Sequence, residues 1–406
     1  MDRNLRTIDW NISTMGRNLG TIDWNISTMD RNPGTTDWNI STMDRNLGTI
    51  DWNISTMGRN PGTTDWNIST MDRNLRTIDS FEERALYVIL GLQVIYYPPL
   101  AAVGVSVNLL AIVTLSRGKC GLSKCVTRYL VAMAAGDLMV IIFDLILRQI
   151  PIAFGGQFRF LYSIPLCNIH AVLLFAATDC SVWFTVTFTF DRFVAICCEK
   201  LKTKYCTERT AAVVLGTVIL LSCLKNISWY FMFTGWYQLH NTPWFCLVTI
   251  SVLESRVWGV IELLHYILTP GVPFVLILLL NAFTVRSILV ASRARRRLRG
   301  HSSGESPRDP EMESRRKSII LLFLISGNFI LLWALLLVHS IWNRMFYLGF
   351  ESVFLSQLIL ELGYMLQLLS CCTNTFIYAV TQTKFREQLK NVVKYPFIAS
   401  VQIIKS

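Results

Sequence analysis

Seven apolar runs of at least 20 residues follow one another from about residue 85 onward, and they restrict the fold of this chain more than any other feature. Each run is long enough to cross a hydrocarbon layer of roughly 30 Å as a helix. Because a backbone in lipid must satisfy its own hydrogen bonds, the pattern predicts an all-α membrane protein, a seven-transmembrane helix bundle. The expected spans are residues 86–116, 126–150, 164–198, 208–234, 257–290, 317–342 and 353–380.

The composition supports a bilayer environment. Hydrophobic residues make up 52% of the chain and charged residues only 16%, whereas a soluble domain has about 25% charged residues. A net charge of +11 could suggest nucleic acid, but the basic residues lie in the connections between apolar runs. We therefore expect contact with the lipid bilayer and none with nucleic acid. The eleven cysteines show no CxxC pair and no zinc-ligand spacing, which excludes a disulfide scaffold and a zinc finger.

A tandem repeat precedes the first run. Residues 1–70 are five near-identical copies of a 14-residue unit, and a sixth copy stops at Asp79. The unit has little apolar content and no helical or strand period, so residues 1–80 are expected to be disordered. If the segment is extracellular, its N-I-S sequons predict a glycosylated stalk; the alternative is an expanded minisatellite, or repetitive DNA taken into the gene model. The acceptor residues are Asn11, Asn25, Asn39, Asn53 and Asn67.

Lys and Arg residues gather in alternate connections. They lie at 117–128 after the first run, at 200–209 after the third and at 293–317 after the fifth. By the positive-inside rule, this distribution predicts an extracellular N-terminus and a cytoplasmic C-terminus in the plasma membrane. With no signal peptide evident, the first span is expected to act as a signal-anchor. A cluster such as 295–297 could alternatively bind acidic lipid or a partner.

Polar residues inside apolar spans are costly, so each of them needs a reason. In chain order they are Asn108, Asp137, Asp191 with Arg192 and Phe193, Trp333 four residues after Phe329, and the run from Asn374 to Tyr378. In this order and at these depths they resemble the signature of rhodopsin-like (class A) G-protein-coupled receptors over about residues 85–395. Pro273 and Asn281, the R-R-x-x-R-G of the fifth connection and the L-W-A of the sixth span look like the orphan branch thought to sense aromatic amino acids and short peptides.

The resemblance implies a receptor that couples to a heterotrimeric G protein. In this family the residue at the position of Arg192 turns from its neighbouring acid, here Asp191, toward the G protein once the sixth span swings outward. Trp333 would be the pivot beneath the ligand, and Tyr378 would move toward Arg192.

The family also implies a disulfide and an allosteric sodium ion. The disulfide would join Cys167, at the start of the third span, to Cys246 in the following outer loop. The ion would be held by Asp137, Ser181, Ser370 and Asn374, although Cys371 replaces a usual oxygen ligand. The alternative is a protonated Asp137 in a water-lined hydrogen-bond network. No other cofactor is expected.

Several positions depart from the family pattern. Leu335 and Thr375 stand where prolines are usual, Asn281 stands where a Tyr is common, and Arg315 stands where many members have a Glu that locks Arg192. Because a like charge cannot lock Arg192, the sequence predicts a weakly latched resting state with basal activity. The departures are also compatible with a decaying gene.

Polar residues in the outer halves of the spans are candidates for a ligand pocket. They are Asp144, Arg148, Asp179, Glu262, His265, His339, Glu361, Tyr364 and Gln367. Leu174 stands where amine receptors have an Asp, which argues against an amine ligand. Acids beside an Arg suit an amino acid or a peptide terminus, with its carboxylate on Arg148 and its amine on Asp179 or Glu361. Alternatively, Asp144 and Arg148 neutralise each other as an i,i+4 pair.

Other classes of protein lack support in the sequence. Residues 262–265 form an E-x-x-H, but a second such motif and H-E-x-x-H are missing, which argues against a membrane enzyme. Two related halves with broken helices, as in transporters, are not evident. A non-signalling product of a duplicated receptor gene stays open. After the receptor domain at 81–381, residues 382–406 predict an amphipathic helix on the inner leaflet and a short tail. Residues 315–318, R-R-K-S, and the serines at 302, 303 and 306 could be kinase targets.

Overall fold

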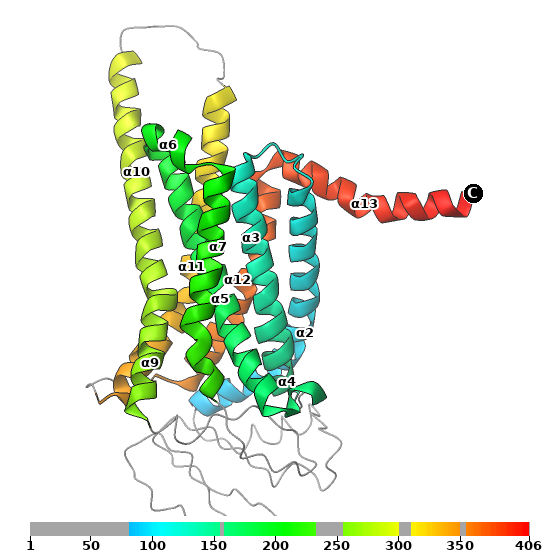
Figure 1. Ribbon diagram of the computed structural model, residues 1–406, viewed down its shortest axis with the longest axis vertical. Helices are drawn as coiled ribbons and strands as arrows, with labels where there is room; N and C mark the ends of the chain where they lie inside the picture. The colour runs from blue at the N-terminus through cyan, green and yellow to red at the C-terminus, as the bar shows by residue number, and fades with distance from the viewer. Residues whose placement is uncertain (1–80, 155–157, 233–254, 300–309, 350–354, 406) are drawn as a thin grey trace, which may run out of the picture.

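The computed structural model of the protein describes residues 81–154, 158–232, 255–299, 310–349 and 355–405 (Figure 1). Near an edge of several of these ranges the structure describes the backbone alone, for example at Arg315. The repeat with its five sequons and Cys246 lie outside the described residues, so the predictions made for them stay predictions.

Long helices run side by side and form a single bundle (Figure 1). The first is α2 (Phe81–Ser116). The second span is α3 (Lys124–Val140), the π-helical η2 (Ile141–Gln149) and α4 (Ile150–Ala153). After η3 (Arg159–Tyr162) come α5 (Ile164–Cys197), the short α6 (Glu199–Tyr205), and α7 (Glu208–Asn226) with η4 (Ile227–Phe231). The chain continues through α9 (Arg256–Tyr266), η5 (Ile267–Gly271) and α10 (Val272–Arg299), then α11 (Pro310–Tyr347), α12 (Gln357–Thr381) and α13 (Thr383–Lys405).

Six of the described helical segments are long and apolar enough to cross a membrane, and they coincide with the first six predicted spans. The seventh, α12, is apolar but less so, because it carries Glu361, Gln367 and Asn374. These side chains lie inward, where α12 packs between α11 and α2. The seventh predicted span is therefore a helix of the bundle whose hydropathy is lowered by residues that face its interior.

The interior and the outer surface of the bundle differ in the way expected for a membrane protein. Helix α5 packs against α3, α7, α10 and α11 and so forms its centre. Large apolar side chains point outward, for example Leu331, 74% exposed, and Val380, 73% exposed. An outer surface of this kind is stable in lipid and would aggregate in water.

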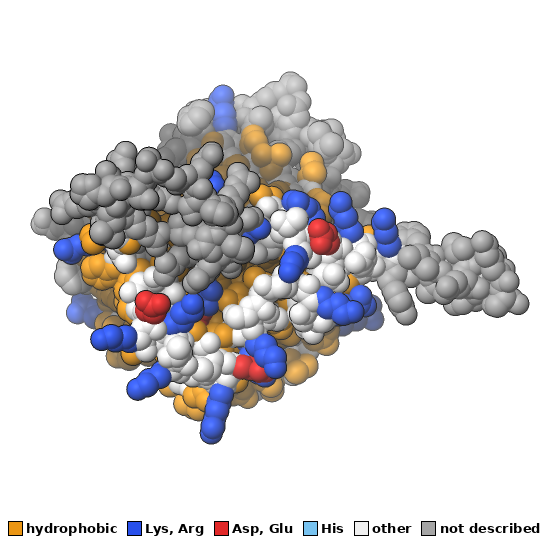
Figure 2. All heavy atoms as spheres, turned by 90° about the horizontal axis from the view of Figure 1, so that it is seen from above, with side chains coloured by type: hydrophobic (Ala, Val, Ile, Leu, Met, Phe, Trp, Pro, Cys, Tyr) orange, Lys and Arg blue, Asp and Glu red, His pale blue; other side chains and the backbone are white. Residues whose placement is uncertain are grey.

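One end of the bundle is rich in basic side chains. This is the end at which α6 lies and α13 begins, and Figure 2 looks down on it. Lys and Arg surround the described part of this face, with only a few Asp or Glu among them. One acid, Glu208 at the start of α7, lies between Lys124 and Arg128 of α3.

Candidate functional site

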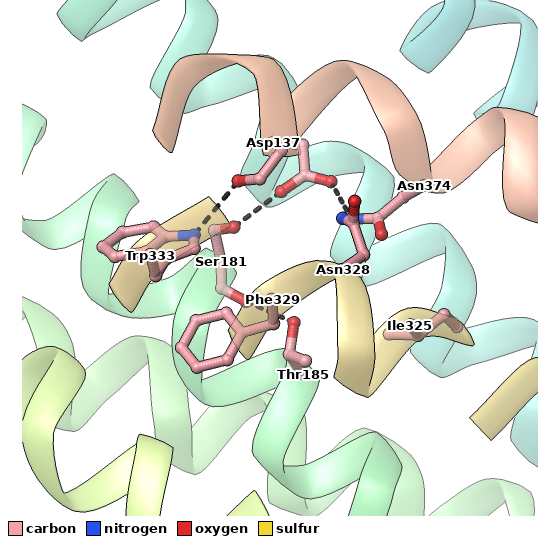
Figure 3. A pocket seen from close by; sticks show the side chains of 9 residues that line it. Asp137, Ser181, Thr185, Ile325, Asn328, Phe329, Trp333 and Asn374 are labelled. Atoms are coloured by element: carbon pink, nitrogen blue, oxygen red, sulfur yellow. Dashed lines mark hydrogen bonds between the residues drawn. The ribbon is translucent and has the colours of Figure 1, made fainter. Parts of the chain in front are cut away.

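A buried carboxylate, Asp137, lies at the centre of the bundle and is bound by residues from two other helices (Figure 3). Ser181 of α5 donates a 2.6 Å hydrogen bond to Oδ1 of Asp137, and Asn374 of α12 donates a 2.8 Å hydrogen bond to Oδ2. Asp137 is only 2% exposed. Three of the four residues predicted to hold a sodium ion are thus in direct contact.

A small cavity adjoins this carboxylate. It has a volume of about 10 Å³, which is room for about one water-sized particle. It is lined by Asp137, Ser181, Thr185, Ile325, Asn328, Phe329, Trp333, Ser370 and Asn374. Asn328 was not singled out in the sequence, although an Asn in an apolar span could have drawn attention to it; its Oδ1 accepts a 2.9 Å hydrogen bond from Thr373.

The donor set of the cavity fits a small hard cation better than a transition metal. No cluster of three or more His, Cys, Asp or Glu side chains suited to a metal occurs in the described part of the chain. The cavity instead offers the Asp137 carboxylate, the Ser181 and Ser370 hydroxyls and the Asn374 amide. Oxygen ligands of this kind suit hard cations.

Trp333 connects this cavity to an aromatic cluster. Its Nε1 donates a 3.0 Å hydrogen bond to Oγ of Ser370, which lines the cavity. The ring of Trp333 lies 5.5 Å from that of Phe329, and Phe329 lies 6.4 Å from Phe274 of α10 (centroid distances). Tyr364 packs against the same cluster from α12. A movement of Trp333 would therefore alter both the contact with Ser370 at the cavity and the aromatic contacts that reach α10.

At the basic end of the bundle, Arg192 is held by its neighbour and by α11. It forms an ion pair with Asp191, with Nε 3.0 Å from Oδ2. The other carboxylate oxygen accepts a hydrogen bond from the Cys125 thiol at 3.2 Å. Nη1 of Arg192 donates to Oγ of Ser318 at 3.3 Å, which joins α5 to α11. Burial and the nearby Asp191 raise the pKa of the Cys206 thiol to about 11, so it stays a neutral donor to the Asp191 carbonyl.

The remaining signature residues pack helices together. Asn108 of α2 donates 2.9 Å hydrogen bonds to the carbonyls of Gly104 and Cys371, and so ties α2 to α12. Tyr378 is fully buried, with its ring edge-on to Phe385 of α13 at 6.0 Å between centroids. Helix α11 runs through Leu335 without interruption, as expected where the usual proline is missing.

Asp144 and Arg148 form the ion pair that their spacing suggested, with 3.1 Å between Oδ1 and Nη1. The guanidinium of Arg148 also lies over the ring of Tyr364, 5.1 Å from its centroid. The Asp144 side chain is 4% exposed and the Arg148 side chain 34%. The buried Tyr97 hydroxyl has no hydrogen-bond partner among the described residues.

Asp179 lies in a different cluster, with a lysine that the sequence analysis missed. Nζ of Lys225 in α7 lies 2.7 Å from Oδ2 of Asp179, which is 1% exposed. The same ammonium contacts Nδ1 of His265 at 3.3 Å and Oγ1 of Thr269 at 3.2 Å. Asn226 donates to Asp179 at 2.6 Å. Lys225 is a charged residue inside an apolar run, and this could have revealed it.

The other candidate pocket residues do not gather in one place. Glu262 pairs with Arg344 of α11 at 2.5 Å, and His339 contacts the Asn343 amide at 2.9 Å. Glu361 accepts from Gln93 and Gln357, at 2.8 and 2.9 Å. Gln367 is 2% exposed, and its backbone carbonyl accepts from Ser370. The residues predicted to form one ligand pocket therefore lie in several polar clusters. Within each cluster the polar side chains bind one another or a neighbouring backbone group.

The cysteines agree with the predicted pattern as far as the structure describes them. Cys167 is disulfide-bonded. Nine cysteines are free, namely Cys120, Cys125, Cys180, Cys197, Cys198, Cys206, Cys223, Cys371 and Cys372. The pairing of Cys167 with Cys246 stays a prediction, because Cys246 lies outside the described residues.

A bundle of membrane-crossing helices with a buried carboxylate at its centre and an Asp–Arg pair at its basic end agrees with the class of helical membrane receptor that the sequence resemblance predicted. The family model of the 7 transmembrane receptor (rhodopsin family) matches residues 107–378. The chain belongs to this family. It is also 24% identical over 327 residues to the mouse (Mus musculus) protein "Probable G-protein coupled receptor 142", covering 77% of this chain and 75% of the mouse protein.

These findings confirm the resemblance to rhodopsin-like receptors. The chain is a multi-pass membrane protein of a receptor family, and membership in that family implies a ligand and G-protein coupling in general. It points to a receptor rather than an enzyme.

Proposed function

We propose that this protein converts the binding of an extracellular amino acid or short peptide into G-protein activation by an outward movement of α11. The observation that carries this proposal is the contact between Arg192 and Ser318. Arg192 is only 8% exposed and is held between its own helix and α11. Separation of α11 from α5 would break that hydrogen bond and uncover a guanidinium at the basic end of the bundle.

The contact between α5 and α11 at Arg192 is a hydrogen bond of 3.3 Å to Ser318, which supports a weakly latched resting state. The Arg192 guanidinium donates here to a neutral hydroxyl, and a hydrogen bond to one charged group contributes about 1.5–3 kcal/mol. A ligand needs to supply only a small differential binding energy to open a contact of this kind. Basal signalling above that of mock-transfected cells is the expected consequence.

The proposed orientation places the end with α6 and the start of α13 in the cytoplasm of cells, at the plasma membrane, with the N-terminus outside. The gathering of Lys and Arg at that end supports it (Figure 2). Epitope tags at the two termini would be detected on opposite sides of the membrane in intact and permeabilised cells. Detection of both tags on the same side would disprove this topology.

For the ligand, we favour a molecule with both a carboxylate and an amine. Arg148 is part-exposed, and its contact with Tyr364 places it beside the cluster around Trp333. Of the two acids considered for the amine, Glu361 suits it better, because it is paired with neutral amides. Asp179 is 1% exposed and already matched by Lys225.

An allosteric sodium ion at Asp137 is a further part of the proposal. The carboxylate, the Ser181 and Ser370 hydroxyls and Asn374 would hold it, and the ion would neutralise the buried charge. The cavity of about 10 Å³ supports a single small occupant. A protonated Asp137 beside one water is the alternative.

A second-messenger screen of amino acids and short peptides in transfected cells tests the proposal. For an active compound, Arg148→Gln and Glu361→Gln are each expected to lower potency about tenfold or more, because each removes one charged hydrogen-bond partner. Glu262→Gln, in the separate pair with Arg344, is the matched control. Unchanged potency in Arg148→Gln would rule out the binding of the ligand carboxylate to Arg148. If no compound is active and basal second-messenger output does not exceed that of mock-transfected cells, the results would favour a non-signalling gene product.

A further inference from the structure

Two adjacent cysteines, Cys197 and Cys198, lie where α5 leaves the basic end of the bundle. Helix α5 ends at Cys197, Cys198 has non-helical backbone angles, and α6 begins at Glu199. Both thiols are free and half-buried, and neither has a hydrogen-bond partner among the described residues. The other inner segments, 293–317 and 373–406, contain no cysteine.

The remaining cysteines described near this end are less open to a reagent. Cys120 and Cys125 are 5% and 2% exposed, and each thiol donates a hydrogen bond. Burial raises the pKa of the half-buried Cys206 thiol to about 11, so little of it is the nucleophilic thiolate. The exposed Cys223 lies in the last turn of α7, about 22 Å along that helix from the basic end. The adjacent pair is therefore the accessible thiol site of this end.

Cys197 continues an aromatic stripe on the surface of α5. Phe190, Phe193 and Cys197 are spaced at i, i+3 and i+7, so they lie on one face of the helix. Phe190 is 38% exposed, and the ring of Phe193 lies 6.5 Å between centroids from that of Phe283 in α10, which is 51% exposed. On a membrane-crossing helix, an exposed apolar side chain faces lipid. A hydrocarbon chain attached at Cys197 can thus follow this stripe into the bilayer.

Helix α6, which follows the pair, suits the surface of a membrane leaflet. Figure 1 shows it at the basic end of the bundle. Leu201 is 53% exposed, and the ring of Tyr205 lies edge-on to Phe190 at 5.3 Å between centroids. The exposed lysines of α6 are Lys200, Lys202 and Lys204. An exposed Leu among lysines fits the boundary between lipid headgroups and hydrocarbon.

We propose that the Cys197–Cys198 pair is an S-acylation site and that a long acyl chain there anchors α6 to the inner leaflet. The co-substrate is a long-chain acyl-coenzyme A, and a membrane-bound S-acyltransferase is the catalyst. The cysteine sulfur forms a bond to the carbonyl carbon of the acyl group, the bond from that carbon to the coenzyme A sulfur breaks, and the thiol proton passes to the released coenzyme A. Juxtamembrane cysteines are substrates of this reversible reaction.

The acyl chain and the lysines of α6 would act together. One chain alone binds a membrane only marginally, whereas a chain beside a basic patch is held stably. Because acyl-coenzyme A is a cytoplasmic substrate, the site rests on the orientation proposed above, with the basic end in the cytoplasm.

The test uses the epitope-tagged full-length receptor, expressed in cells that are fed an alkyne analogue of palmitate. The purified receptor is coupled to a fluorophore through the alkyne and treated with neutral hydroxylamine, which cleaves thioesters. Hydroxylamine-sensitive label is expected in the wild type and in Cys206→Ser, the matched control, and its loss is expected in Cys197→Ser with Cys198→Ser. An unlabelled wild type, or a double variant that keeps the label, would refute the site.

Mass spectrometry of the wild type locates the acyl group without relying on a variant. An acyl chain on the peptide that contains Cys197 and Cys198 is expected. A chain carried only by other cysteines would contradict the assignment.

Amide hydrogen exchange then tests the anchor. In lipid nanodiscs, exchange over α6 is expected to become faster when hydroxylamine removes the chain from the wild type, with no change in the double variant. Equal exchange before and after treatment would overturn the anchor. A receptor that carries the chain but never drives nucleotide exchange on a G protein keeps this site and loses the proposed signalling, whereas an unlabelled receptor that signals loses only the site.

Discussion

Nζ of Lys225 in α7 lies 2.7 Å from Oδ2 of Asp179 in α5, so two opposite charges stabilise each other within apolar helices. Removal of one partner of a buried pair leaves the other uncompensated, which costs about 3–5 kcal/mol in soluble proteins. We therefore assign this pair a structural role, which is to hold α7 against α5.

The first prediction concerns this pair. Lys225→Met should lower the melting temperature of detergent-purified receptor and reduce its surface expression, because Asp179 becomes a lone buried acid. The double variant Lys225→Met with Asp179→Asn should recover most of the loss, since no charge is then left unpaired. A single variant as stable as the wild type would show that the ion pair contributes nothing.

A second prediction follows from the contact between α5 and α11. Ser318→Ala removes the hydrogen bond to the charged Arg192, which contributes about 1.5 kcal/mol or more. Basal nucleotide exchange should rise about tenfold, the factor that such an energy implies. Ser292→Ala, on an exposed face of α10, should leave it unchanged. Basal exchange that stays the same or falls in Ser318→Ala would count against the latch.

The third prediction tests the proposed ion at Asp137. If sodium stabilises the resting state, basal nucleotide exchange should fall about twofold or more as sodium replaces choline at constant ionic strength. Asp137→Asn keeps the shape of the side chain but removes its charge, so its exchange should not respond to sodium. Equal responses in the wild type and Asp137→Asn would place the ion elsewhere, and no response in either would favour the protonated carboxyl.

Close approach between α11 and α12 gives a fourth prediction. A Cβ at Gly363 would lie 3.0 Å from Cα and 3.1 Å from N of Leu336, and a backbone cannot yield as a side chain can. Gly363→Ala should therefore destabilise the receptor by about 1–3 kcal/mol, measured by thermal unfolding. Gly327→Ala is the matched control, because a Cβ there meets nothing within 4 Å; it should be neutral or stabilise by about 0.5 kcal/mol. Equal effects of the two would contradict this packing.

The signature residues could be placed from the sequence because their spacing along apolar helices determines their depth. Asp137, Ser181 and Asn374 lie on three different helices, and only the family resemblance predicted that they meet, as they do in the structure. The pairing of Asp191 with Arg192 and that of Asp144 with Arg148 also follow from short separations along one helix. Local geometry along one helix was sufficient for the latter two pairs.

The partners of Asp179, Glu262 and Arg192 could not be found in the same way. Lys225, Arg344 and Ser318 lie on other helices, tens of residues or more away along the chain. Periodicity shows which side of a helix faces inward, but the rotation and height of one helix against another depend on side-chain packing throughout the bundle.

By itself, the sequence determined a membrane-crossing helical bundle, its family and the depth of its polar residues, because a bilayer admits few backbone structures and makes every buried charge conspicuous. The tertiary structure decided which of these charges neutralise one another and which contact holds α11 to α5. Such pairings require atoms of different helices to come within a few ångströms of one another, which happens only in the folded bundle. The spacing of residues along the chain does not determine these distances.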